Sequence, residues 1–193
     1  MHETAAFQRE VAERLRELLN ERQCVEEVKS PWVTFRGSGR RIYSPQVDIA
    51  VGPFAIQNQY EENYDRMVNS FSQLLDRWIA GFKKNWFQYM REVNSVEDFY
   101  SPSSYRDFIG ASANRNSRCF IAIEIENENS KKHLMGSIVN AGALGRIGLV
   151  VAWQDKVLRA AIRMRAYFDF LKKVEKRTFD MTGVLVITKN QLV

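Results

Sequence analysis

The sequence has little cysteine and histidine, and it lacks long apolar runs. Its two cysteines, Cys24 and Cys119, show no metal-ligand spacing, so we expect free thiols in a reducing compartment instead of a disulfide scaffold. The two histidines, His2 and His133, form no cluster, and His133 is expected to face solvent. Nowhere do about 18 apolar residues run together, and the first residues are charged where a signal peptide needs an apolar run. These absences predict a cytoplasmic protein with no membrane partner.

The composition is that of an ordinary globular protein. The chain has 193 residues, of which 45% are hydrophobic and 12% aromatic, with four prolines and no internal repeat. This length and composition predict one domain over 1–193, with a helical insertion at about 57–117. There are 28 basic and 23 acidic residues, a formal net charge of +5. That balance fits a polyanionic partner without requiring one.

The stretch from Cys119 to Asn127 has the two-residue period of a β-strand. Cys119 and three isoleucines fall on one face, and Glu124 and Glu126 fall on the other. Two carboxylates on a strand apolar enough to lie inside a sheet need a partner, and a metal ion is the simplest one for both. The alternative is a strand end that emerges into solvent, so that both acids are merely hydrated.

A second acid-bearing strand is predicted over 44–52. Val47, Ile49 and Val51 share its apolar face, which places Asp48 on the opposite face. Before it, Trp32–Phe35 and Ile42 flank a turn with two glycines and three arginines, Arg36, Arg40 and Arg41, which favours a hairpin. The arginines are candidates for contacting a phosphate backbone, although a plain solvated loop is the more common explanation of such a turn.

The remaining elements follow from hydrophobic periodicity. Helices are predicted over 3–22, just after Ser104, after Ser130 and from Asp155, and buried strands at 149–153 and 183–188. The stretch 57–93 is predicted as one long helix, or as two that divide at Gly81. The aromatic stripe from Trp78 to Met90 is interpreted as core or subunit interface, with base stacking as the alternative. Arg115 and Arg118, before the acidic strand, are candidates for contacting nucleic acid.

Pro45 with Asp48, and Glu124-Ile125-Glu126, stand in an order of elements that resembles the PD-(D/E)XK nuclease superfamily. The resemblance implies an α/β, restriction-endonuclease-like fold, with a central mixed β-sheet flanked by helices. It also implies metal ligation by Asp48, Glu124, Glu126 and the backbone carbonyl of Ile125. Glu126 stands where the family usually has lysine, and some restriction enzymes carry glutamate there.

The carboxylates are also suited to the chemistry in their own right. Hydrolysis of a phosphodiester needs an activated water and compensation of negative charge, which Mg²⁺ or Mn²⁺ bound by hard oxygen ligands supplies. Glu126 is a candidate general base. Lys131 and Lys132, in the first turn of the following helix, gain nothing from the helix dipole and are candidates to replace the missing lysine.

The sequence therefore predicts a metal-dependent endonuclease that cleaves double-stranded DNA. We expect a homodimer, since cutting both strands of a duplex takes two sites and two-fold symmetry matches the duplex. One alternative is a catalytically inactive nuclease-fold protein that binds DNA or a protein partner. Another is a structural protein in which the aromatic helix forms an oligomer interface and the acids are incidental.

Overall fold

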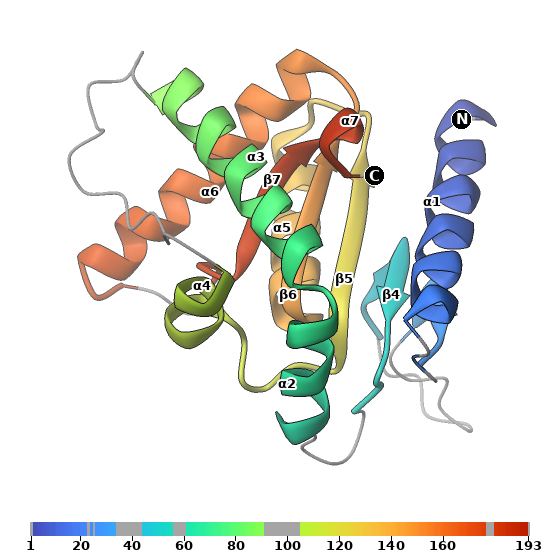
Figure 1. The fold of residues 1–193 in the computed structure, drawn as a ribbon. Coiled ribbons are helices and arrows are strands. Elements are labelled where there is room, and N and C mark those ends of the chain that lie inside the picture. Colours follow the sequence, from blue (N-terminus) through green and yellow to red (C-terminus); the bar gives the residue numbers. More distant parts are fainter. Residues whose placement is uncertain are drawn as a thin grey trace.

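A five-stranded mixed sheet lies at the centre of the fold in the computed structural model, which describes residues 2–22, 24, 26–33, 44–55, 61–90, 105–176 and 180–192 (Figure 1). In spatial order its strands are β1 (Val28–Lys29), β4 (Ile49–Val51), β5 (Cys119–Glu126), β6 (Gly145–Ala152) and β7 (Val184–Thr188). The first three pair antiparallel, whereas β5, β6 and β7 pair parallel. The predicted α/β fold with a central mixed sheet flanked by helices is confirmed.

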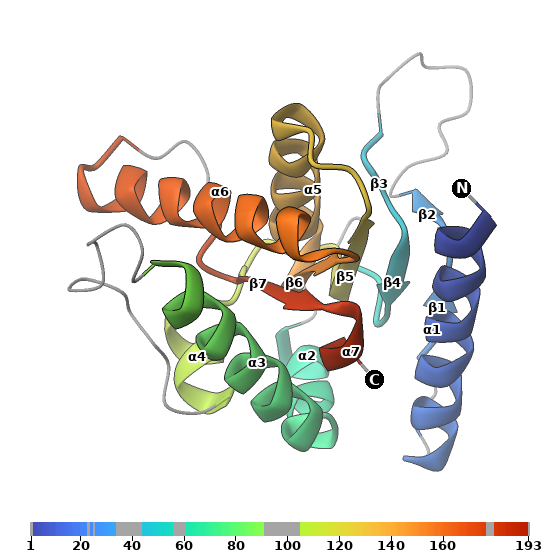
Figure 2. The same ribbon diagram turned by 90° about the horizontal axis from the view of Figure 1, so that it is seen from above.

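Helices cover both faces of this sheet. They are α1 (His2–Glu21), α2 (Glu61–Ser70), α3 (Ser72–Met90), α4 (Tyr105–Ser112), α5 (Lys131–Leu144), α6 (Asp155–Lys173) and α7 (Lys189–Leu192). Figure 2 shows α5 and α6 on one face and α2, α3 and α4 on the other, with α1 along the edge formed by β1 and β4. Because both faces are covered, the parallel strands are buried along almost their whole length.

The predicted strand, helix, strand crossover is β5, α5 and β6. Its second strand begins at Gly145, earlier than the predicted start at 149, and follows Leu144 of α5 without a connecting residue. A Cβ added at Gly145 would lie 2.9 Å from the backbone nitrogen of Ala122 on β5. A glycine therefore allows the end of α5 to approach β5 closely. From the sequence, Gly145 indicated only the end of a helix.

The helical stretch 57–93 divides at Phe71 and not at Gly81, so the predicted break is wrong. Phe71 is fully buried and packs against Phe120 of β5, with ring centroids 5.8 Å apart. Gly81 lies inside α3, where its missing side chain makes room for Gln191. The amide carbon of Gln191 would lie 3.1 Å from a Cβ added at Gly81. The break follows the packing of an aromatic ring, which outweighs the low helix propensity of glycine.

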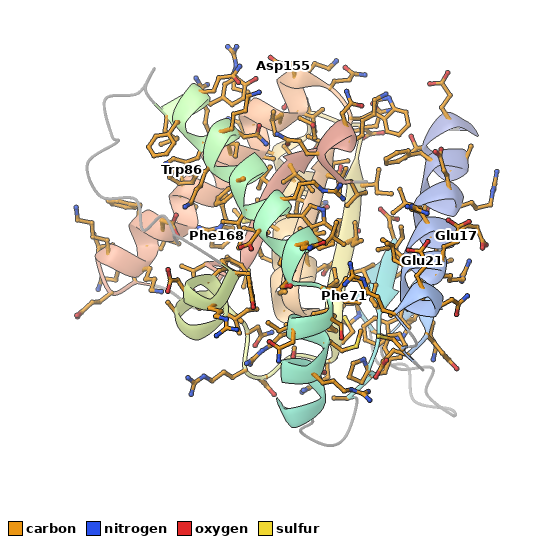
Figure 3. The ribbon with its side chains drawn as sticks, viewed as in Figure 1. Glu17, Glu21, Phe71, Trp86, Asp155 and Phe168 are labelled. Atoms are coloured by element: carbon orange, nitrogen blue, oxygen red, sulfur yellow. The ribbon has the colours of Figure 1, made fainter. Side chains whose placement is uncertain are left out.

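The aromatic stripe of α3 belongs to the core. Trp78, Phe82 and Trp86 are at most 3% exposed, and the Trp78 indole N–H donates to the carbonyl of Leu192 at 2.9 Å. Figure 3 labels Trp86 on α3 and Phe168 on α6, two helices that pack together. Base stacking and an oligomer interface through these three rings are therefore excluded, since they have no surface left to offer.

Two short strands form a separate ribbon beside the sheet. β2 (Trp32–Val33) pairs antiparallel with β3 (Gln46–Val47), as the predicted hairpin requires, while its turn lies outside the described residues. The chain is interrupted at Asp48 before β4 begins. Val47 consequently packs with Trp32 in a small cluster, whereas Ile49 and Val51 enter the main core. The prediction that Val47 shares their face is wrong because the interruption breaks the two-residue alternation.

The structure describes both cysteines and most of the predicted helices. Cys24 and Cys119 are both free thiols, as expected. Within the described part of the chain, no helix is long and apolar enough to cross a membrane.

We predict that Gly145→Ala lowers the free energy of unfolding by about 2 kcal/mol, because the added methyl group meets backbone atoms that cannot move aside. Gly136→Ala is the matched control: nothing lies within 4 Å of its added Cβ in the middle of α5. This control should stabilise the protein by about 0.5 to 1 kcal/mol through helix propensity. Urea unfolding of both variants tests the pair, and equal effects would contradict the close approach at Gly145.

Candidate functional site

Asp48 is held at the point where the ladder between β4 and β5 stops. The last pair is Ile49 with Ile123, and beyond it the Asp48 carboxylate takes over, since Oδ2 accepts the backbone N–H of Ile125 at 2.7 Å. A side-chain oxygen thus satisfies a donor that a strand carbonyl would otherwise bind. This bond places the carboxylate against β5 beside both glutamates.

Helix α1 supports Asp48 from the opposite side. The amide nitrogen of Gln8 donates to the Asp48 carbonyl at 2.7 Å and to the Ser30 hydroxyl at 3.0 Å. The edge helix therefore ties together the residue that follows β1 and the residue that precedes β4. Gln8 was not predicted from the sequence, because the helical period places it only beside the apolar stripe of α1.

Helix α5 holds the two glutamates. Asn140 donates from Nδ2 to Oε1 of Glu124 at 3.1 Å and to the carbonyl of Gln46 at 3.3 Å, while the Ser137 hydroxyl donates to Oε1 of Glu126. Sequence reasoning missed both donors. Their signal was two polar residues three positions apart on a helix whose adjoining face packs in the core through Leu134 and Ile138.

Each carboxylate has one side-chain or backbone donor on a single oxygen, and Glu124 also interacts with the backbone N–H of Asp48. Oδ2 of Asp48 and Oε1 of Glu124 and Glu126 are bonded as described, and the second oxygen of each has no side-chain donor among the described residues. In the same part of the chain, no lysine or arginine forms an ion pair with any of the three. Three acids thus lie near one end of β5, and no lysine or arginine of the described residues is paired with them.

This environment raises the pKa of all three acids. Burial, followed by repulsion from Asp48, raises the pKa of Glu124 from 4.5 to about 8, against the opposing bond from Asn140. Burial also raises the pKa of Asp48, opposed by the Ile125 N–H, and the pKa of Glu126, opposed by Ser137. Desolvation and mutual repulsion both disfavour the charged forms, so the site favours a bound proton or another cation.

The hydrated-acid alternative is wrong for Glu124, which is only 8% exposed. Glu126 is half-buried and its carboxylate is bonded to α5, so it is partly open to solvent. The backbone of Ile125 runs between them, with the side chain in the core and the N–H on Asp48. The site is therefore a partly buried polar group at the end of a buried strand.

A divalent cation fits the donor chemistry of this site but has no assembled cage. Three carboxylates with available oxygens are the ligands that Mg²⁺ and Mn²⁺ prefer. Among the described residues, however, no group of three or more His, Cys, Asp or Glu side chains could hold a metal ion as it stands. Metal binding therefore requires the available oxygens of Asp48, Glu124 and Glu126 to turn towards one point.

The structure does not bring Lys131 to the acids. His133, Ser137 and Asn140 share the face of α5 that carries the glutamate contacts, and at about 100° per residue Lys131 lies on the opposite face. Lys132 lies on the flank, and both lysines are exposed. A catalytic role for Lys132 stays a prediction. Lys131 lies on the face of α5 opposite the glutamate contacts, so it does not face Glu126 directly.

Arg115 and Arg118 lie at the other end of β5. They precede Cys119, the first residue of the strand, and Arg118 donates to Oδ1 of Asn116 at 3.0 Å. Glu124 follows Arg118 by six positions, and in an extended strand this spacing is about 20 Å. The structure does not bring these arginines to the acids; Arg36, Arg40 and Arg41 lie outside the described residues.

His133 is a titratable group that acts on Glu126. It is exposed, as predicted, and its Nδ1 lies 3.9 Å from Oε2 of Glu128. When protonated it lowers the pKa of Glu126 and opposes the effect of burial. Its position on the face of Ser137 makes it part of the rim of the site.

Comparison of the chain with protein-family models, with curated proteins and with solved structures finds no match.

We predict that the metal-free protein loses stability as pH rises. The folded state keeps the Glu124 proton up to a pKa of about 8, whereas the unfolded chain releases it near 4.5, so the free energy of unfolding falls between these two values. Glu124→Gln keeps the oxygen that Asn140 binds and removes the charge. This variant should abolish most of the fall and be more stable at pH 8 by on the order of 3 kcal/mol.

The measurement is urea unfolding with a chelator present across this pH range. Glu10→Gln, an exposed acid on α1, is the control and should retain the wild-type slope. Parallel pH curves for Glu124→Gln and the wild type would show that Glu124 titrates as an ordinary solvated acid.

Proposed function

We propose that this protein is a metal-dependent endonuclease that hydrolyses phosphodiester bonds of double-stranded DNA, in the manner of restriction enzymes. The proposal rests on the resemblance of Pro45, Asp48 and Glu124-Ile125-Glu126 to the PD-(D/E)XK superfamily. The arrangement of the strands supports it, since Asp48 and the glutamates come from adjacent antiparallel strands and the glutamate strand continues into a parallel crossover. A cytoplasmic location goes with this function.

The observation that carries the proposal is the group of three acids with raised pKa values at the end of β5, with which no lysine or arginine of the described residues is paired. Glu124 is 8% exposed, its pKa is raised to about 8, and Asp48 and Glu126 lie close enough to contribute to its electrostatic environment. Buried charges in proteins are normally paired or bind metals. A site that only supported the fold would be more stable with neutral side chains, so the three acids favour a function that needs a cation.

The residues have separate tasks in this proposal. Asp48, Glu124, Glu126 and the carbonyl of Ile125 hold Mg²⁺ or Mn²⁺, which when bound lowers the pKa of a water and compensates charge on the phosphate. Ser137 and Asn140 fix one oxygen of each glutamate and so set the direction of the other. Glu126 is half-buried with a raised pKa, which suits it to accept a proton from the attacking water.

Binding of DNA follows from charge outside the acidic site. The chain has a net charge of +5, and a polyanion gains affinity from counterion release when basic side chains contact its phosphates. The segment between β2 and β3 contains Arg36, Arg40 and Arg41. β3, the strand that pairs with β2, ends next to Asp48. Arg115 and Arg118 would contact a more distant part of the duplex. A homodimer would place one acidic site on each strand.

A second candidate function is a catalytically inactive nuclease-fold protein that binds DNA or a protein. Two observations favour it: Glu126 occupies the position of the usual lysine, and the described residues contain no assembled metal-binding group. Such a protein binds DNA with a strong salt dependence and no requirement for metal. Metal dependence therefore separates the two functions.

We expect Mg²⁺-dependent or Mn²⁺-dependent cleavage of double-stranded DNA, with Glu124→Ala at least about a hundredfold slower because charge stabilisation is lost. Supercoiled plasmid is the substrate and gel electrophoresis the assay. Glu10→Gln should cleave at the wild-type rate. Binding of duplex DNA without cleavage under any metal condition would replace the nuclease by the inactive DNA-binding protein.

We also expect Mn²⁺ to bind with measurable heat, and Asp48→Asn to weaken this binding by about tenfold or more. Asparagine retains an oxygen for the Ile125 N–H, so the variant removes one charge while keeping the bond that positions residue 48. Isothermal titration calorimetry at pH 8, with Glu10→Gln as control, makes the comparison. Equal Mn²⁺ affinity in Asp48→Asn and wild type would remove Asp48 from the metal site.

A further inference from the structure

A hollow lies away from the acids, between the C-terminal half of α1 and the junction of α2 with α3. Its volume is about 200 Å³, and arginines 14, 22 and 77 surround a floor of Leu18, Phe71 and Leu74. Figure 3 shows Glu17 and Glu21 on α1 and Phe71 at the helix junction on the same side of the molecule. The three arginines come from helices separated by about fifty residues of sequence, so the fold itself brings them together.

This hollow, which we call the arginine pocket, is separate from the candidate nuclease site. Glu124 and Glu126 are bonded to α5, which covers one face of the sheet, whereas α2 and α3 cover the other (Figure 2). The arginine pocket therefore cannot contact the same bond of a substrate. Its ligand must be argued from its own chemistry.

Two of the guanidinium groups are held in place by the protein. Arg22 donates to the carbonyl of Ser70, and its guanidinium carbon lies 5.5 Å from the centroid of the Phe71 ring. Arg14 donates from Nη1 to Oε2 of Glu17 at 2.9 Å, with Oε1 of Glu21 3.8 Å away. Each arginine has five N–H donors, so these contacts fix the groups and leave donors for a ligand.

Arg77 has no such partner. No hydrogen bond or ion pair joins it to another residue that the structure describes, and it is exposed on α3. Three positive charges thus line the pocket, and the two negative charges of Glu17 and Glu21 reach it only as partners of Arg14. Exposed ion pairs such as Arg14 with Glu17 contribute little to stability, so the arginine can exchange part of that contact for a stronger anion.

We infer that the arginine pocket binds a phosphate monoester whose attached group rests against Leu18 and Leu74, beside the Arg22 guanidinium that covers the buried Phe71 ring. Guanidinium groups match the oxygens of phosphate with paired N–H donors, and a doubly charged phosphate gains more from several arginines than a carboxylate does. The apolar floor favours an organic phosphate over the free ion. Such a group occurs on a free mononucleotide and on the 5′ end of a nucleic-acid strand.

The test measures binding in a chelator, so that metal at the acidic site plays no part. Inorganic phosphate, adenosine 5′-monophosphate and a short oligonucleotide with and without its 5′ phosphate are titrated by calorimetry. We expect adenosine 5′-monophosphate to bind more tightly than inorganic phosphate, and the 5′ phosphate to strengthen oligonucleotide binding. Tighter binding of the mononucleotide identifies a free nucleotide as the ligand, and tighter binding of the phosphorylated strand identifies a strand end.

Charge variants locate the binding. Arg77→Gln and Arg14→Gln should each weaken binding of adenosine 5′-monophosphate by about tenfold, while Glu21→Gln should strengthen it because a repelling charge is removed. Arg9→Gln is the matched control, since Arg9 is exposed on α1 and does not line the hollow. Circular dichroism spectra and unfolding midpoints establish that each variant is folded.

Three results would overturn the inference: no heat with adenosine 5′-monophosphate up to about 10 mM, equal losses in Arg9→Gln and Arg77→Gln, or no change in Arg77→Gln and Arg14→Gln. These outcomes are independent of the nuclease proposal, because none of them uses metal or measures cleavage. Loss of cleavage with intact binding of phosphate monoesters would remove the nuclease proposal alone.

Discussion

The bond between the Asp48 carboxylate and the N–H of Ile125 is the contact on which the acidic site depends. An antiparallel ladder normally satisfies its donors with backbone carbonyls, and its strands then carry side chains to fixed faces. Here the ladder stops after Ile49 and Ile123, and a side chain completes it. One interruption thereby sends β3 into a separate ribbon with β2, frees the chain to reach α1 through Gln8, and presses a third carboxylate against two others.

That arrangement is electrostatically unfavourable in the absence of a cation, and the surrounding fold supports it. The parallel strands, covered by α5 and α6 on one face and by α3 on the other, provide a rigid hydrophobic core around the end of β5. Asn140, Ser137 and the Ile125 N–H each stabilise one oxygen without neutralising the charge. Proteins concentrate such destabilising groups at functional sites, where the cost is offset by ligand binding.

Most of the core and part of the site could be predicted from the sequence. The alternation over Cys119–Glu126 and the apolar runs of the last strands determined their burial, since period and hydrophobicity depend on local chain geometry. The break at Phe71, the early start of β6 at Gly145 and the donors on α5 could not be read in this way. Each depends on what another element presents to that residue, such as the Phe120 ring, the Ala122 nitrogen or the glutamate oxygens.

The direct passage from α5 into β6 also limits how the length of this region can vary. With no residue between Leu144 and Gly145, an extra residue after Asn140 has no loop to occupy. One way to accommodate the extra residue is to rotate the preceding part of α5 by about 100°, which turns Ser137 and Asn140 away from the glutamates. The other is to shift β6 by one position, which exchanges the two faces of that strand. Insertions and deletions should therefore be excluded here over evolutionary time, while single substitutions on the exposed side of the same helix remain acceptable.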